Sequence, residues 1–516
     1  MAGQVPTYHS LSEIYPAEAL PVQQRRWDNL QASFQEQYGS AAGFVSRSPG
    51  RVNIIGEHID YSLYEVLPMG VTADLLVAVA VHAHPAESLA KIRIANVSSS
   101  NFPRREFAIP ADGDITIDAT SHEWANYFRA GLQGAVSLLR KKRKDPALVP
   151  VGMDLLVDGS VPSGGGLSSS AAFVCASALA VLRANGEEAV DKTELVELAV
   201  VSERAVGVHS GGMDQAASVL ALRDNALYVS FQPSLTARAI RFPTTSPEMT
   251  FLIAQSFVAA DKHVTAPVCY NLRVVEVSLA AEVLAKKLGL TRSLPKDAGP
   301  LNVSLRGLQD TFYEEKGGVA SNGETSTQEF RKQLEQLVQL TKDHLVEDGY
   351  TREEVSAILG MTVEELNKRY MSKFSVRAER FLLRQRALHV FTEAIRVLRF
   401  MAVLEAPSDP SSNLAKALGS IMNETQQSCR DLYDCSCPEL DELCQLALGA
   451  GAYGSRLTGA GWGGCCVHLV PEDRVEAVMQ TWEREYYRKK FPDITAETLA
   501  EAVVVSKPGS GSSVFI

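Results

Sequence analysis

The amino-acid sequence predicts an α+β protein of two or three domains, in which mixed sheets pack against helices. Its 516 residues are more than a single hydrophobic core usually holds. Strand-like and helix-like runs are mixed in both halves of the chain, and the chain becomes mainly helical beyond residue 270. The hydrophobic content of 46% and the charged content of 22% are ordinary for a soluble globular protein.

The first part of the chain alternates between the two kinds of run. An amphipathic helix is expected over about 22–38, and apolar residues recurring at intervals of three and four predict a second helix over 123–139. The alanine-rich run 171–182 and the segment 192–206 predict two more helices. The strands expected in this part lie at 44–45, 52–55, 75–81, 92–94 and 153–157.

Four more strands and a helical region are predicted further along the chain. A stretch rich in glycine, serine, asparagine and threonine, 316–327, predicts an exposed loop. Two capping boxes within 351–370 predict a pair of short helices. Because this pair carries more acidic than basic residues, we interpret it as structural rather than as a DNA-reading motif. The four strands lie at 226–231, 250–254, 465–470 and 502–505.

Charge and hydropathy exclude several classes of partner. With 50 basic and 61 acidic residues the net charge is −11, which disfavours nucleic-acid and membrane binding. The basic run 140–144 precedes Asp145-Pro146 and suits a helix C-terminus. The first residues lack the basic and apolar regions of a signal peptide, and the longest apolar runs are too short to cross a bilayer. We therefore expect a cytoplasmic protein with no nucleic-acid or membrane partner.

The eight cysteines do not form a recognisable metal site. Four of them, Cys429, Cys435, Cys437 and Cys444, cluster without the paired spacing of a zinc site. We interpret them as reduced thiols packed in a helical region.

A glycine-rich segment at 162–172, P-S-G-G-G-L-S-S-S-A-A, stands between a predicted strand and a predicted helix. Backbone N–H groups in such a turn can approach an anion closely, and the helix dipole adds partial positive charge. The segment, here called the glycine loop, is not a Walker A loop because it lacks the G-K-[ST] ending. A tight turn with a serine cap would give the same pattern, so both interpretations stay open.

Two further segments concentrate polar side chains near glycines. The segment 48–61 contains Arg51, Glu57, His58 and Asp60, which together can supply donors and acceptors for a polyhydroxylated ligand. An exposed charged loop is the alternative interpretation.

The segment 202–215 places Glu203 on a helix and Asp214 after a Gly-Gly pair. Asp214 could position or accept a hydroxyl proton, or could cap a helix that follows it. Glu203 could complete a Mg²⁺ shell together with a serine of the glycine loop. A third segment, 453–465, contains five glycines directly before a predicted strand and can pack its backbone against phosphates or against the glycine loop. We call it the C-terminal glycine motif.

These segments resemble the three motifs of the galactokinase branch of the GHMP small-molecule kinases, in the family's order. They match the sugar-binding signature at 48–61, here called the sugar signature, the ATP signature at 162–172 and the glycine-rich motif at 453–465. The resemblance covers about 44–507 and is closest to fungal galactokinases and related N-acetylgalactosamine kinases. It implies a two-domain GHMP kinase fold with the active site in the cleft between the domains.

The resemblance implies a domain of residues 1–245, with the sugar signature and the ATP loop, and a second domain of 246–516. The second would carry a helical insertion at about 285–375 and the C-terminal glycine motif. The implied substrates are galactose and ATP, with Mg²⁺ as cofactor, in a protein that we expect to be a monomer.

Site residues follow from the resemblance position by position. Asp214 matches the aspartate that takes the proton of the sugar C1 hydroxyl, and Arg51 matches the arginine beside it. Mg²⁺ would be held by Ser170, or Ser169, with Glu203. The implied sugar ligands are Arg51, Glu57, His58, Asp60, Ser210, Gly211, Asp214 and Tyr270. The implied nucleotide contacts are Gly164, Gly166, Ser168, Ser169, Trp124, Tyr127, Asp261 and Lys262.

The sequence leaves more than one function open. Ile59 and Ser210 depart from residues common in some relatives, and both touch the sugar site, so an N-acetylgalactosamine kinase stays an alternative to a galactose 1-kinase. A galactose- and ATP-binding transcriptional sensor is a third hypothesis, and a bifunctional chain would have a regulatory protein partner. Sensor paralogues can lack a Ser-Ala step in the ATP motif, and here the run from Ser168 to Ala172 is complete, which favours catalysis.

Overall fold

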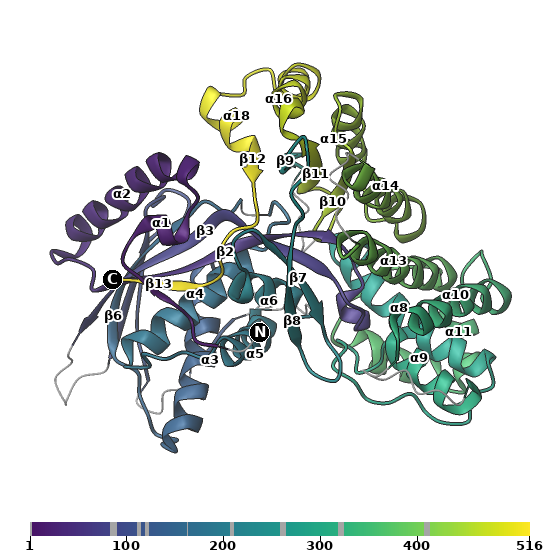
Figure 1. Ribbon diagram of the computed structural model, residues 1–516. Helices are drawn as coiled ribbons and strands as arrows, with labels where there is room; N and C mark the ends of the chain where they lie inside the picture. The colour runs from purple at the N-terminus through teal and green to yellow at the C-terminus, as the bar shows by residue number, and fades with distance from the viewer. Residues whose placement is uncertain are drawn as a thin grey trace.

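Three sheets with helices packed against them make up the structure. The computed structural model describes residues 3–82, 90–110, 115–118, 123–162, 164–206, 211–258, 265–317, 325–406 and 413–516. Among these residues the strands form sheets of seven, four and two strands. In Figure 1 the seven-stranded sheet lies among the purple and blue elements of the early chain, and the green helices of the later chain lie on the other side of the molecule. The predicted α+β class is confirmed.

The seven-stranded sheet brings the two ends of the chain together. Its order is β1-β13-β2-β3-β6-β4-β5, with β13 parallel to β1 and antiparallel to β2. The last strand of the chain therefore lies between the first strand and the rest of the sheet. The strands are β1 (Thr7–Tyr8), β2 (Phe44–Ile55), β3 (Leu67–His82), β4 (Lys91–Asn96), β5 (Arg105–Ala108), β6 (Gly152–Gly159) and β13 (Ser513–Phe515).

β2 is longer than the sequence predicts. The expected strands at 44–45 and 52–55 are its two ends, and the residues between them are also extended. Most of those middle residues are polar, and they can be buried because Arg47 donates to Asp74 at 2.5 Å and the Ser48 hydroxyl lies 2.7 Å from that of Ser512. Buried polar pairs thus replace the apolar alternation that would have marked one continuous strand.

Helices cover both faces of this sheet. α2 (Leu20–Tyr38) packs Trp27 and Phe34 against Leu76 of β3, whereas the adjacent Val77 belongs to the main core. On the main-core side α4 and α6 contact β2 and β3, and α3 and α5 contact α4. These helices are α3 (Ala125–Arg143), α4 (Ser169–Ala184), α5 (Lys192–Glu203) and α6 (Met213–Leu220). The basic run 140–144 forms the C-terminal end of α3, as predicted.

The second sheet is built from the later chain. Its four antiparallel strands have the order β10-β11-β9-β12, and a separate hairpin joins β7 to β8. The sequence does not predict β10, because the buried positions of that strand carry Ser455, Arg456 and Thr458 rather than apolar residues. The strands are β7 (Asn225–Ser230), β8 (Thr236–Arg241), β9 (Met249–Gln255), β10 (Gly454–Thr458), β11 (Cys465–Pro471) and β12 (Val503–Ser506).

The later chain is mainly helical, as predicted. The capping boxes at Thr351 and Thr362 both form, and Tyr370 donates to Glu282 of α8 at 3.1 Å, so this helical pair is structural. The main helices are α8 (Tyr270–Lys287), α9 (Leu305–Phe312), α10 (Thr327–His344), α11 (Arg352–Leu359), α12 (Val363–Leu366), α13 (Leu383–Leu404), α14 (Asn413–Ser428), α15 (Pro438–Gly449), α16 (Val475–Trp482) and α18 (Ala496–Ala502). All eight cysteines are free thiols.

Two sequence predictions stay open at this level. Most of the predicted loop 316–327 lies outside the described residues, and its first two residues end a π-helical turn, Tyr313–Gly317. The division of the chain into domains at 245 stays a prediction. Among the described residues, none of the helices combines the length and the apolar content that a bilayer crossing requires.

Candidate active site

The glycine loop connects β6 to α4 and leaves several of its amide groups without a partner among the described residues. Ser168 occupies the N-cap position of α4 with a left-handed backbone (φ 57°), and its side chain makes no capping hydrogen bond. Within the described part of the chain, the backbone N–H groups of residues 166–171 donate no hydrogen bond. The serine-capped turn that the sequence left open is therefore not what forms. The loop has the free donors that an anion-binding helix start requires.

The C-terminal glycine motif packs directly against the glycine loop. A Cβ atom on Gly459 would lie 2.4 Å from the carbonyl oxygen of Gly166, and a Cβ atom on Gly166 would lie 2.8 Å from that of Thr458. Both glycines have left-handed backbones, with φ of +87° and +74°. Only residues without a side chain allow this approach. The motif thus braces the loop, which is one of the two roles that its sequence suggested.

Arg51 of β2 connects the glycine loop to Asp214. Its Nη1 donates to the carbonyl oxygen of Gly166 at 2.7 Å, and its Nε donates to Asp214 Oδ1 at 2.7 Å. Its own backbone N–H donates to the carbonyl oxygen of Leu167 at 3.1 Å. Burial lowers the pKa of this guanidinium, but the carboxylates of Asp214 and Glu57 more than offset it, so the pKa stays above the ordinary value. Arg51 therefore carries a fixed positive charge at this junction.

Asp214 lies in the first turn of α6 and does not cap it. The N-cap is Gly212, with φ of 104°, so the helix-capping interpretation of Asp214 is wrong. Its neighbour Gly211 donates to Asp60 Oδ2 at 3.1 Å, and a Cβ atom there would lie 2.6 Å from that same oxygen. Burial and the nearby Asp214 carboxylate raise the pKa of Asp60 to about 6, against the opposing effect of His58. The carboxyl groups of Asp60 and Asp214 thus lie close enough to interact, and Asp214 is paired with Arg51.

Glu57 and His58 attach the sugar signature to the C-terminal glycine motif. Glu57 Oε2 accepts hydrogen bonds from Arg456 and from the backbone N–H of Gly459, the latter at 3.1 Å. His58 Nε2 lies 2.9 Å from the carbonyl oxygen of Ala460. Sequence reasoning missed Arg456, although it is the single charged residue of the C-terminal glycine motif.

An aromatic cluster lies on the other side of His58. The Nδ1 atom of His58 lies 2.9 Å from the Tyr61 hydroxyl, and that hydroxyl lies 2.5 Å from the Tyr433 hydroxyl. The ring of Tyr270, the first residue of α8, lies 5.9 Å from that of His58 and 5.8 Å from that of Tyr61. Burial is the largest effect that raises the pKa of Tyr270, and the negative charges of Asp60 and Asp214 raise it further. This phenol therefore lies near both acids. The sequence predicts Tyr270 here but not Tyr61 or Tyr433.

The predicted nucleotide-side aromatics lie beside the start of α4. Trp124 stacks on Phe173 with ring centroids 6.0 Å apart and an 8° angle between the planes. The ring of Tyr127 lies 6.5 Å from that of Phe173. Phe173 belongs to the second turn of α4, so both side chains lie close to the helix that the glycine loop begins.

Glu203 is buried at the end of α5 and accepts a hydrogen bond from Gln215 of α6. The helix stops there rather than at 206, because Arg204–Val206 form a 3-10 turn. Among the described residues no group of three or more histidine, cysteine or acidic side chains forms a ready-made metal cage. The predicted roles of Ser169, Ser170 and Glu203 toward Mg²⁺ stay predictions. Three more predicted site residues, Ser210, Asp261 and Lys262, lie outside the described residues.

Three family models and full-length relatives match the chain. The galactokinase galactose-binding signature matches residues 32–81, the GHMP kinases N terminal domain 126–221 and the GHMP kinases C terminal 411–489. The galactokinase of Schizosaccharomyces pombe is 41% identical over 99% of this chain and 98% of its own. The chain belongs to the galactokinase family. Another relative in this family, the galactokinase of Saccharomyces cerevisiae, is 40% identical over 99% of this chain and 98% of its own.

Solved structures support the GHMP kinase fold that the resemblance implies. The galactokinase of Lactococcus lactis complexed with galactose superposes with a TM-score of 0.62 at 22% identity, covering 94% of this chain and 99% of the other. The Methanococcus jannaschii mevalonate kinase gives a TM-score of 0.50 at 13% identity, covering 90% and 98%. The structures confirm the fold, and the full-length relatives confirm the family assignment made from the three motifs.

Proposed function

We propose that this chain transfers the γ-phosphoryl group of ATP to the C1 hydroxyl of galactose, giving α-galactose 1-phosphate and ADP. The observation that carries the proposal is the Arg51 bridge, which places a glycine loop with free amides next to the carboxylate of Asp214. Phosphoryl transfer depends mainly on alignment and on cancelling negative charge, and this junction supplies both. The galactokinases named above support galactose as substrate and give no support to the N-acetylgalactosamine kinase or sensor hypotheses.

Asp214 would act on the sugar hydroxyl. As the C1 oxygen forms its bond to the γ-phosphorus and the bond from that phosphorus to the ADP oxygen breaks, the hydroxyl proton passes to the Asp214 carboxylate. Arg51 would hold that carboxylate in place and offset charge on the transferring group. The remaining sugar contacts in the proposal are Glu57, His58, Asp60, Ser210, Gly211 and Tyr270.

The glycine loop would hold the nucleotide phosphates through its free N–H groups and the Ser168 and Ser169 hydroxyls. Gly164 and Gly166 supply the left-handed backbone of this loop, with φ of +72° and +74°, and Trp124 and Tyr127 would flank the adenine. Asp261 and Lys262 complete the proposed nucleotide contacts.

Mg²⁺ fits the donor chemistry beside this loop. Ser169 or Ser170 with Glu203 would offer oxygen ligands only, and the buried Glu203 carboxylate lies at the end of α5. Bound there, the ion supplies positive charge that neutralises the phosphates. The chain's own contribution is to fix Glu203 through Gln215, since the amide of Gln215 donates to that carboxylate.

A substrate comparison tests the proposed function. Purified protein with Mg-ATP should release ADP with galactose, and should do so much more slowly with N-acetylgalactosamine. Turnover faster with the acetamido sugar would replace the substrate assignment. Absence of turnover with both sugars, in protein that still binds ATP, would refute the kinase proposal in favour of the sensor.

Galactose binding should weaken as the pH falls from about 7 to about 5. The pKa of Asp60 is about 6, so the carboxylate that would accept sugar hydroxyls becomes neutral in this range. Calorimetric titration of galactose across this range measures the effect. Asp214→Asn removes the neighbouring anion that helps to raise this pKa, so the midpoint should move to lower pH. A midpoint that stays the same in Asp214→Asn would contradict the assigned coupling.

We also propose that the protein works as a cytoplasmic monomer, because a net charge of −11 favours a soluble chain that does not self-associate. Light scattering after gel filtration would overturn the monomer if it gave a mass well above 55.9 kDa.

A further inference from the structure

Glu57 of the sugar signature is held on three sides by residues more than three hundred positions away in the chain. Its backbone N–H donates to Glu393 Oε1 at 3.2 Å, and its carbonyl oxygen is 3.0 Å from His389 Nε2. Its carboxylate is held by Arg456 and the Gly459 amide. Glu393 and His389 are four residues apart on α13, so they lie on the same face of that helix.

Glu393 is the most fully engaged of these groups. Its side chain is completely buried, and Oε1 also accepts from the backbone N–H of Gly56 at 2.8 Å. Oε2 accepts from Arg396 Nε at 2.6 Å and from the Thr425 hydroxyl at 2.9 Å. Burial raises the pKa of this carboxyl, but Arg396, His389 and Arg456 outweigh it and bring the pKa to about 2. The group is therefore an anion at neutral pH.

The backbone of the turn after β2 points its amides at the Glu393 carboxylate. Gly56 has a φ of +101°, and a Cβ atom there would lie 2.9 Å from the Val66 side chain. This backbone directs two consecutive N–H groups, of Gly56 and Glu57, to the same carboxylate oxygen. Charge-assisted hydrogen bonds from adjacent amides fix the position of a turn more strongly than neutral ones. The buried Glu393 carboxylate accepts from two amides of the sugar signature and can therefore fix the backbone geometry of that segment.

We propose that Glu393, assisted by His389, is a positioning residue that sets the orientation of Glu57 and thereby the affinity for the sugar. The inference rests on the proposed function and adds to it a residue on α13 outside the three family motifs. Among the described residues, the hydrogen-bond partners of the Glu393 carboxylate are Gly56, Glu57, Arg396 and Thr425, and none of them belongs to the glycine loop or is Asp214. Its loss should therefore affect the sugar and spare the nucleotide.

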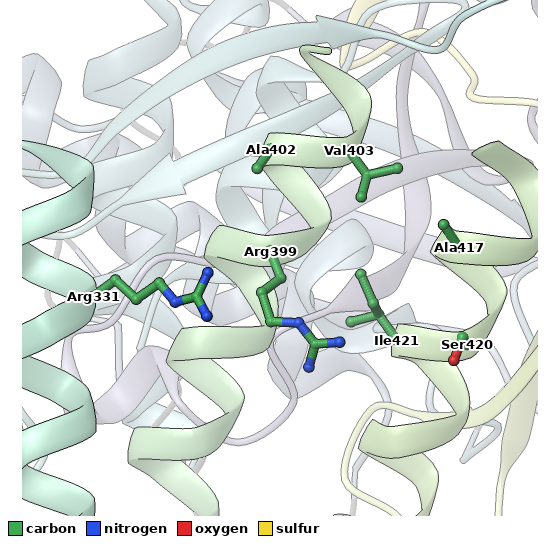
Figure 2. Close-up of a pocket in the computed structure, with 7 residues that line it drawn as sticks. All are labelled: Arg331, Arg399, Ala402, Val403, Ala417, Ser420 and Ile421. Carbon is green, nitrogen blue, oxygen red and sulfur yellow. The ribbon is translucent and has the colours of Figure 1, made fainter. Parts of the chain in front are cut away.

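A second, more exposed ion pair, between α13 and α14, offers a control. Figure 2 shows Arg399 of this helix pointing into a pocket of about 420 Å³ that Arg331 and Ile421 also line. Arg399 makes a bidentate ion pair with Glu424 of α14, with Nη1–Oε2 and Nη2–Oε1 distances of 2.6 and 2.9 Å. Glu393 and Glu424 thus both pair with an arginine at the α13–α14 packing, but only Glu393 contacts the sugar signature.

The test compares Glu393→Gln with Glu424→Gln in the full-length protein. Glu393→Gln should raise the galactose KM by about ten- to a hundredfold and leave the ATP KM within about twofold. Glu424→Gln should leave both KM values unchanged. An unchanged galactose KM in folded Glu393→Gln, or an equal rise in both KM values, would overturn the proposal, because a general loosening of the fold affects both substrates.

His389 keeps the proposal testable if Glu393→Gln does not fold. His389→Leu removes the donor to the Glu57 carbonyl, whereas His389→Gln retains one. We expect a raised galactose KM in the leucine variant and recovery of most of it in the glutamine variant; equal values in the two would overturn the proposal. Failure of the proposed function is separate, because it would appear as no galactose turnover in the unsubstituted protein.

Discussion

Asp214→Asn should lower kcat with galactose by about a thousandfold or more. The substitution keeps the shape of the side chain, and its Oδ1 can still accept the hydrogen bond from Arg51 Nε, now 2.7 Å long. What disappears is the carboxylate charge that accepts the hydroxyl proton. Because the backbone of the glycine loop is untouched, ATP affinity should stay within about threefold of its starting value.

A second arginine–aspartate pair in the chain serves as control for this variant. Asp310 accepts from Arg306 Nε at 3.2 Å, and its side chain is 20% exposed, compared with 21% for Asp214. It belongs to α9 and not to the proposed site, so Asp310→Asn should leave kcat unchanged. Coupled measurement of ADP release gives kcat, and calorimetry gives ATP affinity. If Asp214→Asn keeps more than about a tenth of the original kcat, its role as proton acceptor is wrong.

The sequence predicts which residues belong to the site better than it predicts the contacts that hold them. Arg51, Asp60 and Asp214 are separated by up to 163 positions, yet the resemblance to family motifs brings them together, and the structure places Arg51 and Asp214 in direct contact. Such motifs predict spatial proximity between distant residues, because each motif supplies a different part of a single site. Composition and periodicity alone leave the glycine loop undecided between a phosphate cradle and a capped turn.

The parts that sequence reasoning misses are buried polar residues with distant partners. Arg456 lies in β10 and is completely buried, but its partner Glu57 is 399 positions away. Hydrophobic periodicity treats such a residue as exposed, so both the strand and the contact remain hidden. The same reason conceals the middle of β2 around Arg47, and the positioning role of Glu393 on a helix that the sequence predicts only as part of a helical region.

Arg51→Lys should lower kcat/KM by about a hundredfold or more, and unlike Asp214→Asn it should affect both substrates. The guanidinium fork reaches two acceptors at once, the Gly166 carbonyl and Asp214 Oδ1, each at 2.7 Å. A lysine keeps the charge but has one nitrogen, which cannot hold two acceptors in the geometry of a planar fork. Either the glycine loop or Asp214 therefore loses its anchor.

The two substrates separate this role from that of a simple countercharge. If Arg51 only offset negative charge, lysine would restore most of the activity, and the ATP KM of Arg51→Lys would stay near its original value. If Arg51 ties the loop to the acid, both the galactose and the ATP KM should rise or kcat should collapse. Arg306→Lys at the matched pair with Asp310 should show neither effect. Near-complete activity of Arg51→Lys would show that the side-chain bridge is dispensable and that the packed glycines Gly166 and Gly459, with the backbone hydrogen bond from residue 51 to Leu167, suffice to position the segments.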